Sequence, residues 1–240
     1  MIEFNIPDTT LEYPHFSFYN ADNLDIMKYY PDKYFSLSIV DPPYGINAPK
    51  MAVTPCQRKA GSKRLNSGSG KLKNRVLNNL NCEWDNAIPT DDYFKELFRV
   101  SKNQIIWGGN YFPLPPSRCI LCWDKCQPWE NFSQIELAWT SFDFPAQIFK
   151  FDNRTGGKIH PTQKPIALYS WLIHKYANKG DRILDTHLGS ASIALAIDKA
   201  NKADGMELDF VGIELDKDYF DSAMKRFSEG RQQMFLNLNV

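Results

Sequence analysis

The chain has 240 residues, of which 43% are hydrophobic, and its 28 Lys and Arg balance its 28 Asp and Glu. This length suits one large domain with a substantial core, and zero formal charge excludes a uniformly basic nucleic-acid coat protein. Because there is no apolar run of about 20 residues and no leader-like pattern at residues 1–8, we expect a cytoplasmic protein without a membrane partner.

The first part of the chain predicts strands and helices up to a polar interruption. We expect a strand at His15–Tyr19, a helix at Leu24–Tyr30 and a strand at Phe35–Val40. Residues 46–82 are rich in Asn, Ser and Gly, lack acidic residues and are interpreted as a loop or insertion. Its cations are Lys50, Arg58, Lys59, Lys63, Arg64, Lys71, Lys73 and Arg75.

The rest of the chain predicts further alternation of strands and helices. The expected helices are Thr90–Val100, Ile166–Tyr176, Ser192–Lys199 and Asp218–Phe227, the last ended by Gly230. The expected strands are Gln104–Trp107, Cys119–Trp123, Gln134–Trp139, Arg182–Asp185 and Phe210–Glu214. This alternation indicates an α/β fold with a mostly parallel sheet and helices on both faces.

The five cysteines, at positions 56, 82, 119, 122 and 126, form an odd set without a secretory context. We therefore expect reduced thiols. Cys119 and Cys122 lie three positions apart in a predicted strand, so they face opposite sides, and we expect no metal site.

Asp41-Pro42-Pro43-Tyr44 directly follows the apolar run 35–40, at a strand end where open α/β sheets bind ligands. Asp41 can accept a hydrogen bond or a proton from an amine conjugated to a planar ring. The proline pair holds the backbone stiff and offers carbonyl acceptors, and Tyr44 offers a flat face for stacking. An Asp-Pro turn that merely closes the strand is the simpler alternative.

A second set of residues predicts a cradle for an adenosine-like ligand. Between a strand and a helix lie Asp185, Leu188, Gly189 and Ser190, and Gly189 permits a tight turn that aims helix N–H groups at an anion. Glu214 ends the next strand, where an acid commonly accepts hydrogen bonds from ribose hydroxyls.

The segment His160-Pro161-Thr162-Gln163-Lys164-Pro165 precedes this cradle. It offers a cation and a hydroxyl group close to where a ligand carboxylate could lie. Alternatively, it is a proline-rich lead into the helix that follows.

Taken together, these motifs resemble the amino-directed DNA methyltransferases that use S-adenosylmethionine. Their order, with Asp-Pro-Pro-Tyr first and the glycine turn and ribose acid last, resembles the circularly permuted beta arrangement of that family. The segments IIWGGNYF (105–112) and ELAWTSF (136–142) also resemble small phage-like adenine methyltransferases.

The resemblance implies a Rossmann-like class I methyltransferase fold, with a seven-stranded sheet that has one antiparallel strand, in a single domain over residues 1–240. It implies S-adenosylmethionine as cofactor and duplex DNA as substrate, and dimers are frequent in this arrangement, so a homodimer is compatible with it. The implied cofactor-binding residues are Asp22, His160, Thr162, Lys164, Asp185, Leu188, Gly189, Ser190 and Glu214.

The same resemblance assigns the catalytic role to Asp41, Pro42, Pro43 and Tyr44. Asp41 and the Pro42 carbonyl would hold the exocyclic amine of a flipped base, on which Tyr44 would stack. In the family, Asp at the first position goes with adenine, so we expect methylation at N6 of adenine.

Two features depart from the family pattern. Ala191 stands where Gly is common, so we expect its methyl group to crowd the cradle. The segment 141–157 is too short for a separate target-recognition domain, so recognition would fall to residues 46–82, with residues 144–154 as a second candidate segment. The basic residues of 46–82 would contact phosphates.

Other functions stay open at this point. An N4-cytosine DNA methyltransferase, or an RNA or protein amine methyltransferase, would use the same fold. A catalytically inactive DNA-binding module is the alternative of a different class.

Overall fold

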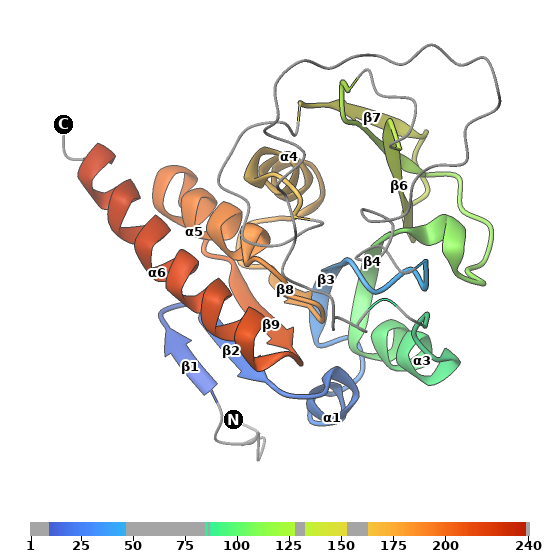
Figure 1. Cartoon of the computed structure of the whole chain (residues 1–240), viewed down its shortest axis with the longest axis horizontal. Helices are drawn as coiled ribbons and strands as arrows, with labels where there is room; N and C mark the ends of the chain where they lie inside the picture. Colours follow the sequence, from blue (N-terminus) through green and yellow to red (C-terminus); the bar gives the residue numbers. More distant parts are fainter. Residues whose placement is uncertain (1–9, 47–84, 86, 128–132, 153–162, 239–240) are drawn as a thin grey trace, which may run out of the picture.

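The computed structural model describes residues 10–46, 85, 87–127, 133–152 and 163–238, with side chains up to residue 232. The strands of these ranges form one sheet in the order β1-β2-β9-β8-β3-β4-β6-β5-β7 (Figure 1). Their bounds are β1 Thr10–Tyr13, β2 Phe16–Asn20, β3 Phe35–Val40, β4 Ser101–Trp107, β5 Leu121–Asp124, β6 Ile135–Thr140, β7 Gln147–Lys150, β8 Arg182–Asp185 and β9 Asp209–Glu214.

The sheet is mostly parallel, as expected. Strands β2, β9, β8, β3 and β4 run parallel, whereas β6 is antiparallel to both β4 and β5. The seven inner strands, β2 to β5 in sheet order, thus contain one antiparallel member. The sheet has two more strands than the seven that were expected. Strand β1 pairs with β2 at one edge of the sheet, and β7 pairs with β5 at the other.

Helices cover both faces of the sheet (Figure 1). Helices α1 (Asn23–Met27) and α3 (Asp91–Val100) lie on one face, and α4 (Ile166–Tyr176), α5 (Ser192–Asp204) and α6 (Lys217–Leu238) lie on the other. A short 3-10 turn, η1 (Gly109–Tyr111), follows β4. None of the helices in these ranges is long and apolar enough to cross a membrane.

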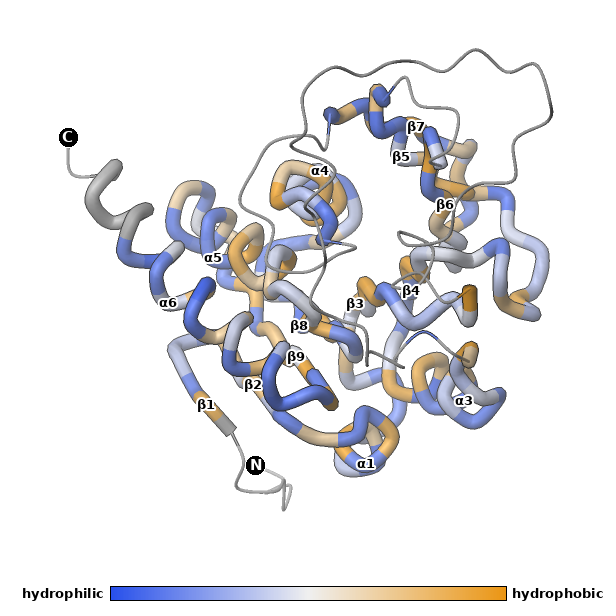
Figure 2. The backbone as a smooth tube through the Cα atoms, in the orientation of Figure 1, coloured by the Kyte–Doolittle hydropathy of each residue, from blue (hydrophilic) through white to orange (hydrophobic). Residues whose placement is uncertain are grey.

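Each helical layer packs on its face of the sheet and forms a hydrophobic core there. Leu97 and Val100 of α3 pack with Ile26 of α1 on one side, and Leu172 of α4 packs with Ile197 of α5 on the other; all five side chains are buried. Figure 2 shows the corresponding alternation of hydrophobic and hydrophilic residues along α1 and α3. The central strands lie between the two cores, and this packing fixes the positions of their carboxyl ends.

Three expected helix ends were wrong, because α1 ends at Met27 and not at Tyr30, α5 continues past Lys199 to Asp204, and α6 continues past Gly230. Gly230 does not stop α6, which continues to Leu238. A Cβ atom at position 230 would lie 2.6 Å from Cδ2 of Leu195, so this glycine allows α6 to pack closely on α5. The residue serves a contact between helices, and it is not a C-terminal cap.

Candidate active site

The central parallel strands bring three acidic residues to one edge of the sheet. Asp41 follows β3, Asp185 ends β8 and Glu214 ends β9, and these strands are neighbours in the order β9-β8-β3. Since the carboxyl ends of parallel strands meet at the same edge, residues far apart in the sequence line one site.

The turn after β3 is fixed by an acid that the sequence did not single out. Asp85 is buried, and its Oδ1 accepts hydrogen bonds from the backbone N–H groups of Tyr44, at 2.7 Å, and Gly45, at 2.9 Å. This carboxylate therefore sets the backbone on which Tyr44 is presented.

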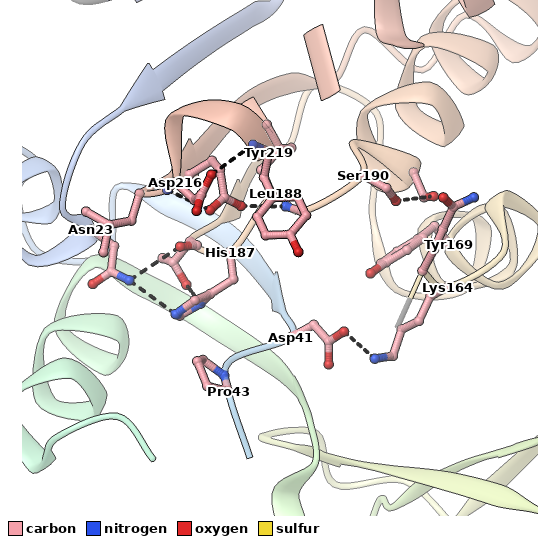
Figure 3. Close-up of a pocket in the computed structure, with 16 residues that line it drawn as sticks. Asn23, Asp41, Pro43, Lys164, Tyr169, His187, Leu188, Ser190, Asp216 and Tyr219 are labelled. Atoms are coloured by element: carbon pink, nitrogen blue, oxygen red, sulfur yellow. Dashed lines mark hydrogen bonds and ion pairs between the residues drawn. The ribbon is translucent and has the colours of Figure 1, made fainter. Parts of the chain in front are cut away.

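Both carboxylate oxygens of Asp41 have partners within the site. The hydroxyl of Tyr44 donates to Oδ1 at 2.6 Å, and the ammonium of Lys164 pairs with Oδ2 (Figure 3). Lys164 also lies 3.3 Å from the hydroxyl of Tyr44. The side chains of Asp41, Tyr44 and Lys164, which come from two distant segments, thus contact one another.

The Asp41–Lys164 pair extends into a partly buried network of charges. Glu136 on β6 lies 3.2 Å from Nζ of Lys164 and 2.5 Å from Nζ of Lys125. Oε2 of Glu136 is buried without a well-aligned hydrogen bond, so we treat its contact with Lys164 as an ion pair only. Two acids and two lysines balance one another in this network.

The network sets the protonation of its members. Burial raises the pKa of Asp41, and the ammonium of Lys164 opposes this. Burial disfavours the charged form of Lys164, but Asp41 and Glu136 outweigh it and raise the pKa of this lysine. Burial likewise acts against Glu136, yet Lys164 and Lys125 lower the pKa of that carboxyl. Lys164 therefore stays charged and compensates the two partly buried acids.

Two glycines after β4 make room for the aromatic side of the site. A Cβ atom on Gly108, which has φ +69°, would lie 2.2 Å from the ring of Tyr44. A Cβ atom on Gly109 would lie 2.4 Å from Cβ of Trp139 on β6. The ring of Tyr111 stacks on Tyr44 with centroids 5.0 Å apart and an interplanar angle of 14°.

A cavity of about 330 Å³ opens beside Asp41 (Figure 3). Its walls carry three acids, Asp41, Glu214 and Asp216, against one base, Lys164. The other lining residues are Asn23, Pro43, Gln163, Tyr169, Thr186, His187, Leu188, Gly189, Ser190, Ser192, Leu215 and Tyr219. The excess of acids gives the cavity a negative field, which favours a ligand with cationic groups.

Gly189 of the glycine turn lines this cavity. Gly189 has φ +52°, and its N–H donates to Oε2 of Glu214 at 2.9 Å. Ala191 also adopts a left-handed conformation, with φ +55°, but it is fully buried in the core and does not line the cavity. The expected crowding of the cradle by the Ala191 methyl group is therefore not observed.

Asp185 and His187 have strongly shifted proton affinities. Burial raises the pKa of Asp185 to about 8, although the carboxylate accepts the backbone N–H of His187 at 3.0 Å. Burial lowers the pKa of His187 to about 3, so its ring is neutral. Its Nε2 lies 3.3 Å from Nδ2 of Asn23, and its Nδ1 lies 2.9 Å from Oγ1 of Thr186.

A second cavity of about 210 Å³ adjoins the first across His187. Its lining includes Asn23, Pro43 and His187, which also line the first cavity, and Asp22. The side chain of Asp22 caps α1 by accepting the N–H of Leu24 at 2.8 Å. Asp22 thus faces the smaller cavity, whereas Leu188, Gly189, Ser190 and Glu214 face the larger one. Asp185, which was also expected to bind the cofactor, is buried and lines neither of these two cavities.

Several residues that the sequence singled out lie outside the described ranges. They are His160, Thr162 and the cations Lys50, Arg58, Lys59, Lys63, Arg64, Lys71, Lys73 and Arg75. Conversely, sequence reasoning missed the roles of Asp85, Lys125, Glu136, Tyr111 and His187. For Glu136 a signal existed, because the motif ELAWTSF puts an acid in a strand that is otherwise apolar.

The fold and the site define an α/β protein of the class I methyltransferase type, with a ligand cavity at the carboxyl edge of its parallel strands. A model of the DNA methylase family matches residues 102–225, just over half of the chain, and the chain belongs to this family. The match begins after Asp41–Tyr44 and includes Lys164, the glycine turn and Glu214. The family predicted from the motifs is confirmed, with S-adenosylmethionine as the methyl donor of that family.

Individual proteins that resemble this chain share only a modest part of its sequence. The type II methyltransferase M2.LlaDCHI of Lactococcus lactis subsp. cremoris is 25% identical over 156 residues, which cover 65% of this chain and 52% of that protein. The chain therefore spans about half the length of this relative.

Solved structures share the fold. The cytosine-N4-specific PvuII DNA methyltransferase superposes with a TM-score of 0.53 at 12% identity, covering 93% of this chain and 95% of its own. The M1.HpyAVI–SAM complex superposes with a TM-score of 0.50 at 20% identity, covering 88% and 99%. At these identities the likeness establishes the fold and does not distinguish adenine from cytosine as the target.

Proposed function

We propose that the chain transfers a methyl group from S-adenosylmethionine to the N6 amine of an adenine flipped out of duplex DNA. The observation that carries this proposal is the partly buried Asp41 carboxylate, which sits between an aromatic ring and a negatively biased cavity. The family membership supports the reaction class, and the adenine target rests on Asp at the first position of Asp-Pro-Pro-Tyr.

The larger cavity suits the proposed cofactor. S-adenosylmethionine supplies an electrophilic methyl group on a cationic sulfur, and it also carries an ammonium group. The three acids on the cavity walls complement such cations. We assign Glu214 to the ribose hydroxyls, since its carboxylate is already oriented by the backbone N–H groups of Gly189 and Asp216, at 2.9 and 3.1 Å.

Asp41 would act on the target amine as a hydrogen-bond acceptor. The lone pair of this amine is delocalised into the base, and acceptors that draw its hydrogens out of the ring plane free that lone pair to attack the methyl group. Because Lys164 already pairs with Oδ2 and Tyr44 with Oδ1, the incoming amine must share or replace one of these partners. We assign the second acceptor to the carbonyl of Pro42.

Lys164 takes a different role from the one expected of it. Its ammonium lies on Asp41 and Glu136, and its side chain is only 3% exposed. We infer that it compensates the partly buried charge of Asp41, which keeps this acid available as a carboxylate. The lysine would thus support the catalytic acid more directly than it binds a cofactor carboxylate.

DNA binding is assigned to the basic segment 46–82. It directly follows the Asp-Pro-Pro-Tyr motif, and its eight cations suit contacts with phosphates. In this proposal residues 1–240 act as one methyltransferase domain without a separate target-recognition domain.

The proposal is tested with purified protein, labelled S-adenosylmethionine and unmethylated DNA of mixed sequence. We expect label in DNA and a loss of at least about a hundredfold in Asp41→Ala, because the variant lacks the acceptor for the amine. Asp25→Ala, which changes an exposed acid on α1, is the matched control and should keep full activity. Cofactor binding and thermal stability of Asp41→Ala are measured alongside.

Label that appears only in RNA or protein would contradict the DNA substrate. Cofactor binding without transfer to any DNA would instead support an inactive DNA-binding module. Undiminished transfer by Asp41→Ala would remove Asp41 from the mechanism.

A further inference from the structure

We propose that Tyr111 is a second stacking residue of the target-base site, which covers Tyr44 in the free protein and packs on the flipped base in the complex. This inference rests on the proposed function, because it concerns how the same site holds its planar substrate. It assigns a ligand contact to η1, a turn that none of the motifs above connects with the base.

The geometry of the two rings carries the inference. Tyr44 and Tyr111 are nearly parallel, at 14°, with centroids 5.0 Å apart. This is the arrangement that a base would adopt on Tyr44, so Tyr111 occupies the position of a planar ligand. Tyr44 itself cannot swing away freely, because its hydroxyl is bound to Asp41 and its backbone N–H to Asp85.

The surroundings of the rings indicate which of them moves. Gly108 packs so tightly on Tyr44 that a Cβ atom there would lie 2.2 Å from the ring, whereas Tyr111 is 43% exposed. Within the described part of the chain, the hydroxyl of Tyr111 makes no hydrogen bond. Tyr111 is thus the mobile member of the pair, and the face of Tyr44 beneath it is the one that a ligand can reach.

Only a small displacement is needed to admit a base. Stacked carbon atoms lie about 3.5 Å apart, so two rings with a base between them are separated by roughly 7 Å. Tyr111 lies in a three-residue 3-10 turn that begins after Gly108, where φ is +69°. An outward shift of this turn widens the gap while Tyr44 and Asp41 keep their contacts.

Three substitutions separate stacking from simple coverage of an apolar surface. Tyr111→Phe keeps the flat ring, Tyr111→Leu keeps an apolar cover without a flat ring, and Tyr111→Ala removes both. Tyr29→Ala serves as the matched control, because Tyr29 is exposed to a similar degree, 39%, but does not stack on Tyr44. For each variant we measure kcat and KM for mixed-sequence DNA, the Kd for S-adenosylmethionine and Tm.

We expect Tyr111→Ala and Tyr111→Leu to lose about tenfold in kcat/KM for DNA, within the range known for one stacked base. Tyr111→Phe and Tyr29→Ala should stay close to wild type, and all variants should keep their cofactor Kd. Wild-type kinetics in Tyr111→Ala, or in Tyr111→Leu alone, would overturn the stacking role while leaving the proposed function intact. An inactive wild-type protein would instead contradict the proposed function itself.

Discussion

Among single side chains, Asp185 gives the site its clearest dependence on pH. Burial raises the pKa of this carboxyl to about 8, so it is mostly neutral at pH 7 in the ligand-free protein. Asp185 lines neither cavity itself, but the residues that follow it, Thr186 and His187, line the larger one, so a cationic ligand there favours the carboxylate. Below pH 8 the proton must first be removed. The affinity for such a ligand therefore falls as the pH falls.

We predict that S-adenosylmethionine binds more weakly as the pH decreases from 8 to 6, by up to about tenfold per pH unit. Isothermal titration calorimetry at several pH values measures this directly. Asp185→Asn should bind weakly at every pH and lose the slope, whereas Asp92→Asn, at an exposed site on α3, should keep it. An affinity for wild type that does not change between pH 6 and 8 would be inconsistent with this role.

Some residues of the Asp41 site could be predicted from the sequence, and others could not. The motif Asp-Pro-Pro-Tyr could be read from the order of residues alone, and so could the glycine turn. By contrast, the pairing of β6 with β4 brings Glu136 to the site, and Asp85 reaches it from a separate loop. A single sequence does not record which distant side chains meet.

Among the helices and strands, continuous apolar runs made prediction reliable. The bounds of β3, α4 and β8 agree with those expected, because a buried run begins and ends sharply with the polarity of its residues. Strands β1 and β7 were not predicted. Each has four residues and lies at a sheet edge, where pairing with the neighbouring strand determines whether a strand forms. Gly230 was misinterpreted because its role depends on Leu195 of another helix.

The junction of β4 and η1 offers a test of close packing. A Cβ atom on Gly109 would lie 2.4 Å from Cβ and 2.8 Å from N of Trp139, so β6 must shift to admit it. We predict that Gly109→Ala lowers the free energy of unfolding by about 3 kcal/mol. Gly205→Ala, at an open position with φ +60°, should cost only about 1 kcal/mol. Chemical denaturation compares the two, and equal losses would show that Trp139 does not restrict this position.

For the whole molecule, charge is balanced in sum but not in distribution. The chain has zero formal charge, yet residues 46–82 hold eight cations and no acid. Association with DNA through this segment should therefore weaken with salt, because each phosphate contact releases counterions.

Deletion of residues 63–73 removes Lys63, Arg64, Lys71 and Lys73. We predict a reduction of the slope of log K against log salt by up to about 3.6, at about 0.9 per lost phosphate contact. Fluorescence anisotropy with labelled duplex DNA measures the slope, and calorimetry should find the cofactor affinity unchanged. A deletion variant with the wild-type slope would exclude these four residues from DNA contact.

In the proposed function, the Asp41 site methylates adenine at N6. The most direct measurement is mass spectrometry of nucleosides from unmethylated DNA that was incubated with the protein and S-adenosylmethionine. We predict N6-methyladenine with the wild-type protein and none with Asp41→Ala. N4-methylcytosine as the product, or no methylated nucleoside with active cofactor binding, would contradict the claim.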